Sequence, residues 1–528
     1  MPLSFMEIPA RRSVAVFALL AIFMVIVSYL LILVLAAACV YFPFLLLTST
    51  NAGGLQLLLL FLGGIAVAGA LLWSLVPRRD KFAAPGALLD RSAQPRLFEE
   101  LEAIAAALNE PLPREVYLIG PVNAFVSDRG GVMGFGSRRV MGIGLPLFSL
   151  LSVSEFRAIL AHEFAHYYGG DTRLGPWVYK TQTAMMRTFG NIGSIRRIGR
   201  IMVLQVLLLV VTAILKWYFI AFLRIINFIS RHQEFRADEL ACIVAGVEPL
   251  EHGLRKIHGG SLAWKFYWES EIAPCVNQGC VPPIGEGFSR FLNNPKIREQ
   301  VEKGTEHEIK EGKSNPYDTH PPLRDRMEAI KHLQVAPHPD DCQLAVSLLR
   351  QPGNAELEFL AALNPDLRKD SLRLVEWDQL GRKVTIPYWQ STIRKYAHFL
   401  KPATAESLPE TLDSLPHIVS QIPDPKGVLL TPEQRKHRAG QLFAMALGLS
   451  LLEQGWELED QPGSSYLHKG EKTVNVSEAV EELLRGRLNR DSWVALCREL
   501  GISELVFPPA SISVSGPLGV SAEAGPSA

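Results

Sequence analysis

Two long apolar stretches near the N-terminus constrain the fold of this 528-residue chain more than any other feature. Residues 13–47 are almost wholly apolar, and a second apolar stretch runs from Leu55 to Val76 after a short uncharged link. About 20 apolar residues suffice for a helix to cross a bilayer, and neither stretch has the polar face that a helix on a soluble core needs. The first stretch also exceeds the apolar core of a signal peptide. We therefore predict a two-helix transmembrane hairpin as the anchor, over residues 1–80.

Basic residues give the expected orientation of this hairpin. Arg11 and Arg12 precede the first apolar stretch, Arg78, Arg79 and Lys81 follow the second, and the link between them carries no charge. Cytoplasmic ends of membrane helices are enriched in Lys and Arg. We expect a multi-pass protein of the cell (inner) membrane whose N-terminus and whole chain after residue 77 face the cytoplasm.

Composition narrows the class of protein further. The 53 basic and 53 acidic residues balance, which gives no electrostatic reason to expect nucleic acid as a partner. The six cysteines are scattered, and a cytoplasmic location favours free thiols. We expect a folded chain with several domains, a lipid bilayer as its environment and no nucleic acid.

Residues 161–166, Ala-His-Glu-Phe-Ala-His, contain the pattern His-Glu-x-x-His. On a helix His162 and His166 lie one turn apart on the same face, so both imidazoles can bind one metal ion. Glu163 lies beside them, where its carboxylate can take a proton from a metal-bound water. The alternative is a chance match on a helix with two surface histidines, and such a match has a likelihood of about 2 per cent in a chain this long.

Local signals place this pattern on a helix independently of the histidines. Ser152 followed three residues later by Glu155 is typical of a capping box at a helix start, and Gly169-Gly170 is a helix stop. The metal-binding pattern therefore falls where a helix is expected.

A third metal ligand is needed, because a catalytic zinc ion has three protein ligands and one open position. Glu234 and Asp238 lie one helical turn apart in the segment Glu-Phe-Arg-Ala-Asp. Glu234 can bind the metal while Asp238 accepts the other N–H of a ligand histidine and fixes its tautomer. Taken alone, two carboxylates at this spacing indicate a solvated helix face.

Together these segments make the chain similar to a known family. It resembles the HtpX-like and CAAX-prenyl-protease-like membrane zinc metallopeptidases. The matching segments occur in the family's order along roughly residues 85–330. They are Asn123-Ala124-Phe125, His162 to His166 with Gly170-Asp171, Glu234 to Asp238, and Thr319-His320-Pro321-Pro322. The resemblance implies a gluzincin-like zinc metallopeptidase domain with a small sheet.

The same resemblance implies roles for individual residues. His162, His166 and Glu234 would bind one zinc ion per chain, Glu163 would be the general base, and His320 a candidate stabiliser of the tetrahedral oxyanion. Two acidic residues, Asp238 and Asp171, would contact the ligand side chains and not the metal itself. The strands around Asn123, Ala124 and Phe125 present an edge on which an extended peptide substrate can be held.

The segment between the ligands, residues 201–229, is apolar enough for a membrane helix and contains only Lys216 and Arg224 as charged residues. A single crossing would put His166 and Glu234 on opposite sides of the membrane, and about 30 residues are too few for two crossings. Basic residues flank both ends, at Arg196, Arg197, Arg200 and Arg231. We therefore expect the segment to lie against the membrane or dip into it without crossing, unlike family members that have two spans here.

The expected fold is mainly α, with α+β domains. In the metallopeptidase domain, residues 81–335, we predict a helix from Pro95 to Asn109, strands at 116–119 and 139–143, a hairpin turn at 130–136 and a loop at 285–288 over the cleft. In a small C-terminal α+β domain, residues 336–507, we predict hairpins at 372–387 and 456–474, and helices at 431–454 and starting near Ser477 and Asp491. Residues 508–528 should be a disordered tail.

The predicted function is that of a membrane-anchored zinc metalloendopeptidase, which hydrolyses peptide bonds of protein substrates on the cytoplasmic side. One alternative is a protease that acts on lipidated C-termini. Another is an inactive scaffold that keeps zinc for structure. Glu163 argues against the scaffold, because a structural site needs ligands but no base.

Overall fold

A computed structural model describes residues 11–49, 54–76, 80, 82–131, 136–167, 175–198, 202–312, 320–364, 372–413 and 430–512. These residues form mostly helices and a few small sheets, which confirms the predicted fold class. The chain divides into two compact units, residues 1–262 with 300–367 and residues 263–299 with 368–528. This division differs from the expected domain boundaries, because residues 336–367 belong to the first unit and residues 263–299 to the second.

The first unit begins with the predicted membrane hairpin. Helices α1 (Arg11–Ser49) and α2 (Gly54–Leu75) are both apolar enough to cross a membrane. They pack closely at Gly64, where a Cβ atom would lie 2.0 Å from the carbonyl oxygen of Cys39. Only glycine permits this approach of the two backbones.

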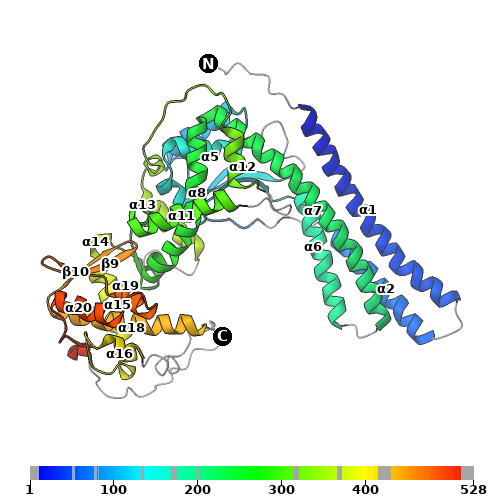
Figure 1. Cartoon of the computed structure of the whole chain (residues 1–528). Coiled ribbons are helices and arrows are strands. Elements are labelled where there is room, and N and C mark those ends of the chain that lie inside the picture. The colour runs from blue at the N-terminus through cyan, green and yellow to red at the C-terminus, as the bar shows by residue number, and fades with distance from the viewer. Residues whose placement is uncertain are drawn as a thin grey trace. The chain divides into compact units, whose positions relative to one another are not determined.

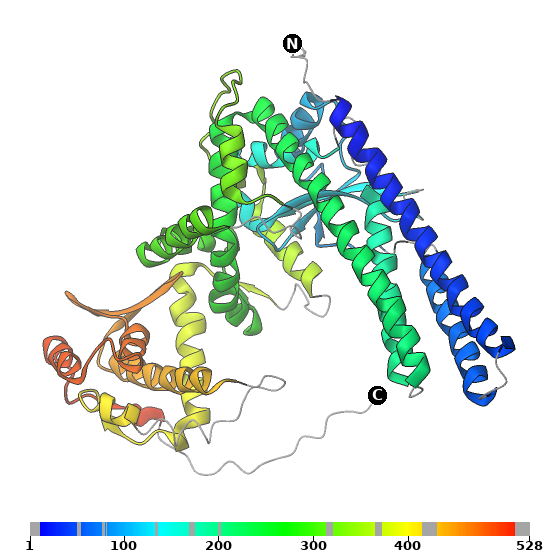
Figure 2. The same cartoon turned by 45° about the vertical axis from the view of Figure 1, so that its right-hand side comes forward.

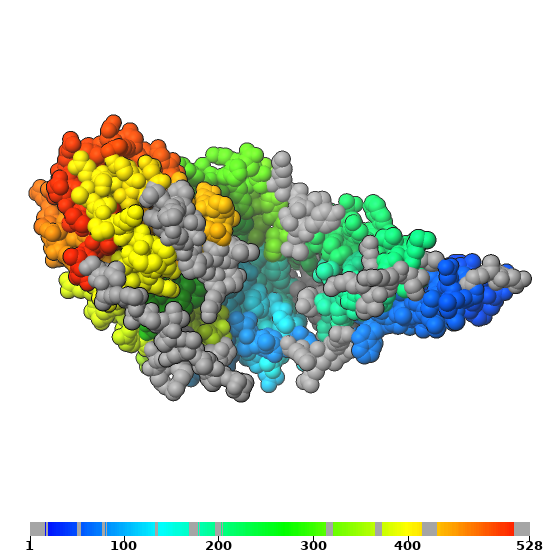
Figure 3. All heavy atoms as spheres, turned by 90° about the horizontal axis from the view of Figure 1, so that it is seen from below, coloured from blue at the N-terminus to red at the C-terminus, as the bar shows by residue number. Residues whose placement is uncertain are grey.

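Two further helices extend this pair into a bundle. Helix α6 (Gly175–Ile198) and helix α7 (Met202–Ala245) run alongside α1 and α2 (Figures 1 and 2). The end of α6 and the start of α7 lie at the same end of the bundle as the junction of α1 and α2. Seen from below, α1 and α2 form the blue surface beside the green α6 and α7 (Figure 3).

Helix α7 bears on the expected behaviour of residues 201–229, which stays a prediction. Residues 202–229 belong to one helix that continues without interruption to Ala245, and Leu204–Ala245 is the third candidate membrane span. Residues 201–229 alone are too short to cross twice, but α6 supplies an outgoing limb and α7 the returning one. His166 and Glu234 can therefore lie on one side even if α7 crosses.

Helix α6 was not recognised as a bundle helix because it is polar. Its polar side chains form hydrogen bonds with α2. The hydroxyl groups of Thr188 on α6 and Ser74 on α2 are 2.6 Å apart. Arg187 donates to the carbonyl oxygen of Ser74 at 3.0 Å, and Asn191 donates to that of Ala70 at 3.4 Å. Polar groups that are paired between helices cost little in an apolar environment, so hydropathy alone does not reveal such a helix.

The sheet of the first unit has the strand order β1-β2-β4-β3. Strands β2 and β4 are parallel, β3 is antiparallel to β4 at the edge, and the bounds are β1 (Ala87–Leu88), β2 (Glu115–Ile119), β3 (Ala124–Arg129) and β4 (Arg138–Gly144). The strands expected at 116–119 and 139–143 are confirmed, and residues 130–136 join β3 to β4 as expected, although 132–135 lie outside the described residues.

Helices surround this sheet. The predicted helix at Pro95 is confirmed as α3 (Pro95–Ala107). The other helical segments that lie wholly or partly in this unit are α4 (Leu145–Leu150), α5 (Val153–Ala165), α8 (Val247–Tyr267), α11 (Pro295–Glu311), α12 (Leu323–Ile330), a 3-10 turn (Ala345–Leu348) and α13 (Pro352–Leu363).

The second unit is built around α18 (Pro432–Glu453), whose buried face includes Phe443 and Leu447. Its other segments are a π-helical turn (Trp268–Ile272), α9 (Ala273–Asn277), β5 (Cys280–Val281), α10 (Ile284–Asn293), β6 (Arg373–Leu374), α14 (Trp377–Leu380), a π-helical turn (Gly381–Thr385), α15 (Ile386–Tyr396), a 3-10 turn (Ala397–Phe399), β7 (Ala403–Thr404), α16 (Leu408–Asp413), β8 (Glu457–Gln461), β9 (Ser464–Lys469), β10 (Lys472–Val474), α19 (Val476–Leu484), α20 (Arg490–Leu500), β11 (Val506–Phe507) and a 3-10 turn (Ala510–Ile512).

Several expectations for this unit are confirmed and two are wrong. Helix α18 starts after Thr431 with a capping box, helices α19 and α20 start near Ser477 and Asp491, and the predicted hairpin at 456–474 is a three-stranded meander. The hairpin expected at 372–387 is wrong, because β6 is followed by helical turns. The loop expected at 285–288 is also wrong, because these residues lie in the amphipathic helix α10. Residues 513–528 lie outside the described residues.

Candidate metal centre

Helix α5 presents the two histidines, and its start is fixed as the sequence predicts. The Glu155 N–H donates to the side chain of Ser152 at 3.2 Å, and the Ser152 N–H donates to Glu155 Oε2 at 2.8 Å. This capping box confirms the predicted helix start. The helix ends at Ala165, and His166 is the capping residue at its C-terminal end with helical backbone angles. His162 and His166 therefore remain on one face.

Helix α7 brings a carboxylate to this face. Glu234 is 3% exposed, and its two oxygens lie 3.4 Å from His162 Nε2 and 3.4 Å from His166 Nε2. One nitrogen or oxygen of each of these three residues lies within 4.8 Å of the others. The structure thus brings Glu234 next to His162, which lies 72 positions earlier in the sequence, and next to His166, on two packed helices.

Asp238 lies one turn further along α7, behind His162. Its Oδ1 is 2.9 Å from His162 Nδ1, and its side chain is completely buried. A carboxylate in this position accepts the Nδ1–H and leaves Nε2 free to bind a metal.

Arg326 of α12 is a residue of this centre that the sequence did not reveal. Its guanidinium donates to Asp238 through Nε at 2.8 Å and through NH2 at 2.5 Å. Arg326 is 6% exposed, so this is a buried two-point ion pair. Its only sequence signal is its place six residues after His320 in a helix that follows two prolines.

His320 reaches the centre from the segment before α12. Its Nδ1 lies 3.0 Å from Glu234 Oε2, while most of its side chain is exposed. The hydrogen bond to Glu234 raises the pKa of His320. A histidine in this place can carry a proton on the open side of the metal-binding group.

Glu163 lies on α5 between the two histidines in sequence and is half-buried. Burial raises the pKa of Glu163 to about 7. A carboxylate with a pKa near neutrality is suited to accept and return a proton at neutral pH.

The histidines differ in their protonation. Burial lowers the pKa of His166 to about 4, so it is neutral at pH 7 and ready to bind a cation. Burial and Arg326 also act to lower the pKa of His162, but its hydrogen bonds with Asp238 and Glu234 outweigh them and raise it to about 9. A metal cation must displace the proton from His162, so binding should weaken as the pH falls.

The other candidate residues lie at different places. Asn123 immediately precedes the edge strand β3, which begins with Ala124 and Phe125 and packs against α5. The structure thus puts these residues at or next to the edge of the described sheet, beside the helix that carries His162 and His166. Asp171 lies outside the described residues.

The residues present fit a metal ion on their own geometry. Donor atoms of His162, His166 and Glu234 lie within 4.8 Å of one another, on side chains that are buried or half-buried. One cation placed among them can therefore be reached by all three. Two imidazoles and one carboxylate are a ligand set found in catalytic zinc sites.

Comparison with known proteins agrees with this geometry. Residues 91–334 match the sequence model of Peptidase family M48. Residues 91–334 therefore form an HtpX-like M48 peptidase domain. The domain contains strands β2, β3 and β4 of the sheet, α5, α7 and α12, and thus every described residue of the metal centre.

Relatives of this M48 domain are named as proteases. The chain is 26% identical over 260 residues to a "Protease HtpX homolog" of Pyrobaculum islandicum, which covers 46% of this chain and 68% of that protein. It is 26% identical over 297 residues to "Protease HtpX" of Xylella fastidiosa, covering 51% of this chain and 92% of that protein. It is 27% identical over 232 residues to "Protease HtpX homolog 2" of Methanosarcina mazei, covering 42% of this chain and 74% of that protein. No solved structure matches.

The M48 match of residues 91–334, the names of the relatives and the apolar helices together support a membrane metalloprotease. The second unit, apart from residues 263–299, lies beyond the M48 match.

Proposed function

We propose that the chain is a zinc-dependent endopeptidase that cleaves protein substrates at the cytoplasmic face of the cell membrane. The observation that supports it most is the convergence of His162, His166 and Glu234, with Glu163 beside them on α5. The basic residues Arg78 and Arg79, which follow α2 in the sequence, support the cytoplasmic orientation.

His162, His166 and Glu234 would hold one zinc ion per chain. When bound, zinc supplies a Lewis acid that polarises the scissile carbonyl group and acidifies water. Asp238 keeps His162 in the required tautomer, and Arg326 holds Asp238 in place.

Glu163 and His320 provide the proton transfers and charge stabilisation in this proposal. Glu163 takes a proton from the attacking water and delivers it to the leaving amine, so that it ends the cycle unprotonated. His320 donates a hydrogen bond to the oxyanion that forms on the scissile carbonyl oxygen. Its exposed position and its raised pKa are consistent with a donor that meets substrate.

Edge strand β3 would hold the substrate. Among the described strands only β4 pairs with β3, so the other side of β3 would accept an extended peptide as an additional strand. Because β3 packs against α5, a peptide on this edge would pass close to Glu163. Asn123, immediately before the strand, would bind the peptide backbone near the cleaved bond.

Metal content and cleavage test the proposal together. Replacing Glu163→Gln keeps the shape but removes the base, so peptide cleavage should fall by a factor of about 10² or more with zinc retained. Glu234→Ala should lose both zinc and activity. Unchanged turnover of a casein-like substrate by Glu163→Gln would place the base elsewhere. Full zinc in Glu234→Ala would remove Glu234 as a ligand.

A further inference from the structure

A cavity of about 610 Å³ lies in the first unit, away from the metal centre. It is enclosed by the start of α5, the corner between α7 and α8, and residues 335–342, which we call the strap. The strap follows the last residue matched to family M48. The rest of the lining, from α5 and the α7–α8 corner, lies within the matched range.

The cavity is lined by side chains that bind metals. Three of them alternate along the strap, His338, Asp340 and Cys342. Two more, Glu248 and His252, lie one turn apart on α8 and therefore on the same face of that helix. Imidazole nitrogen, thiolate sulfur and carboxylate oxygen are the donors that zinc and similar transition metals prefer.

Contacts connect Cys342 with Asp340 and place His338 and His252 beside the same cavity. The Cys342 thiol donates to Asp340 Oδ2 at 3.0 Å. The ring of His338 lies over the α7–α8 corner, where a Cβ atom on Gly246 would be 3.9 Å from His338 Cδ2. His252 is near enough to contribute to the lowered pKa of Asp340, after the hydrogen bonds from Cys342 and Ser154.

His338 gives an independent indication of a ligand. Its Nε2 atom is buried and finds no hydrogen-bond partner in the part of the chain that the structure describes. A buried imidazole nitrogen without a partner is costly unless something else binds it.

The charge of the cavity favours a cation over an anion. Lys256 is neutralised by Glu155, whose Oε2 lies 2.7 Å from Lys256 Nζ. Glu248 and Asp340 then remain as the charged groups of the lining. Hard cations such as Mg²⁺ prefer oxygen donors alone, whereas the thiol and imidazoles here select a softer ion.

We propose that His338, Asp340 and Cys342 of the strap, with His252 of α8, form a second metal site for a transition-metal dication. Among the described residues, only His162, His166 and Glu234 already have donor atoms within 4.8 Å of one another. Binding at the second site therefore draws the strap side chains toward α8 by rotation of their side chains. The Cys342 thiol loses its proton to solvent when it binds the metal.

The strap connects this site to the catalytic helix. The first backbone N–H groups of α5 donate to the strap and to the residue after it: Ser154 N to Asp341 O at 3.2 Å and Val153 N to Gln343 O at 2.8 Å. In return, the Asp341 N–H donates to Ser154 Oγ at 2.7 Å. A metal that fastens the strap to α8 thus also secures the N-terminal end of the helix that carries His162.

Cobalt absorption tests this site in the full-length chain. The catalytic residues offer only nitrogen and oxygen, so thiolate-to-Co²⁺ charge-transfer absorption reports a site that contains cysteine. Titration of the metal-free protein in detergent with Co²⁺ should give two equivalents bound, the second with this absorption. Both the absorption and the second equivalent should be lost in Cys342→Ser and in His338→Ala.

Matched variants separate this site from other thiols and from the catalytic centre. Cys497→Ser changes a buried cysteine of the second unit and should leave the absorption unchanged. All of these variants should keep the first equivalent, which shows that they are folded. One equivalent only in the unchanged protein, or absorption that persists in Cys342→Ser, would overturn the proposal, and neither result bears on the proposed peptidase activity.

Discussion

Arg326 is the residue on which the geometry of the metal centre most depends. It is buried, and it is the partner of the completely buried carboxylate of Asp238. Removing one member of a buried ion pair leaves the other charge without compensation, which costs about 3–5 kcal/mol. We predict that Arg326→Met lowers the stability of the folded chain by this amount, measured by chemical unfolding, and weakens metal binding by about 10- to 100-fold.

Arg324 provides the control for this prediction. It lies on the same helix, its side chain is 55% exposed, and among the described residues its ion pair is with its neighbour Asp325. Exposed ion pairs contribute about 0–1 kcal/mol, so Arg324→Met should behave like the unchanged protein. Equal effects of the two substitutions would show that Arg326 has no special part in the centre.

The acid limb of the pH profile is the second prediction at this scale. Burial holds the pKa of Glu163 near 7, and a base must be unprotonated, so kcat/KM should decrease as the pH falls through this pKa. Bound zinc favours the ionised carboxylate, which places the midpoint at or below about 7. Bound metal is measured at each pH, because loss of zinc would also lower the rate. Full activity well below this pH with zinc retained would contradict Glu163 as the base.

At the residue scale, the sequence predicts which side chains share a face when they lie within one or two helical turns of each other. The spacing of His162 and His166, and of Glu234 and Asp238, follows from the helical period, and the capping box at Ser152 fixes where α5 begins. Arg326 could not be found this way, because it acts on a residue 88 positions away and its neighbours carry no pattern. Only tertiary packing reveals it.

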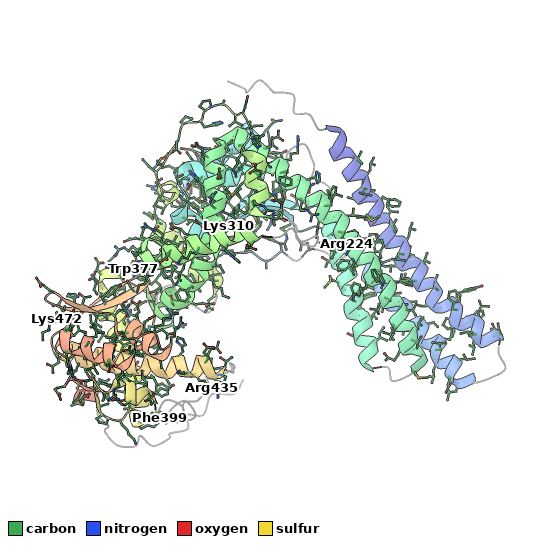
Figure 4. All side chains as sticks on the ribbon, viewed as in Figure 1. Arg224, Lys310, Trp377, Phe399, Arg435 and Lys472 are labelled. Atoms are coloured by element: carbon green, nitrogen blue, oxygen red, sulfur yellow. The ribbon has the colours of Figure 1, made fainter. Side chains whose placement is uncertain are left out.

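At the scale of elements, two exposed tryptophans indicate where helices α2 and α7 leave the membrane. The side chain of Leu204 on α7 lies against Gly63 of α2. Trp73 and Trp217 follow that contact by ten and thirteen residues, about 15 and 20 Å along their helices, and both are largely exposed. Tryptophans mark the interface of a bilayer, so the two helices leave the membrane at a similar level. Arg224 lies beyond Trp217 on α7 (Figure 4).

This level predicts the topology of α6 and α7. If both cross the membrane, the start of α7 faces the same side as the start of α2. Single cysteines at Leu55 and Met202, which are 71% and 79% exposed, should then react alike with an impermeant thiol reagent in intact cells. The native Cys342 should react only after the cytoplasmic side is opened.

The opposite result has a definite meaning. If Met202→Cys is shielded together with Cys342 while Leu55→Cys reacts, α6 and α7 dip into the membrane and return, as the basic flanks of residues 201–229 suggest. Either outcome keeps His162 and Glu234 on one side. Reaction of Cys342 from outside would contradict the cytoplasmic active site.

At the scale of the whole molecule, the two units interrupt one another in sequence. Residues 263–299 lie between segments of the first unit but fold with residues 368–528. Composition changes near residue 336 suggest a boundary there, whereas the contacts place it elsewhere, because segments distant in sequence share one core. Such an exchange of segments leaves no local signal, and the sequence could not have predicted it.

The aromatic side chains of this inserted segment decide what truncation does. Tyr267, Phe288 and Phe291 are fully buried, and Tyr267 packs on Trp377 with ring centroids 6.3 Å apart. Trp377 (Figure 4) also donates from Nε1 to Pro283 O at 2.9 Å. At Gly287 a Cβ atom would lie 2.1 Å from Trp377 Cζ2. Residues 263–299 are therefore tightly packed against the rest of the second unit at this position.

A chain ended after Leu367 would therefore keep the M48 domain but leave these aromatics uncovered. Each buried aromatic side chain represents about 150–250 Å² of surface, and exposed apolar surface of that size promotes aggregation. We predict that this shortened chain aggregates in detergent, as measured by size-exclusion chromatography. A chain ended after Ile512, which keeps the second unit's described residues, should elute like the full-length protein. If the chain ended after Leu367 is instead monodisperse and binds zinc, the catalytic unit folds without its partner, and the second unit is an appendage.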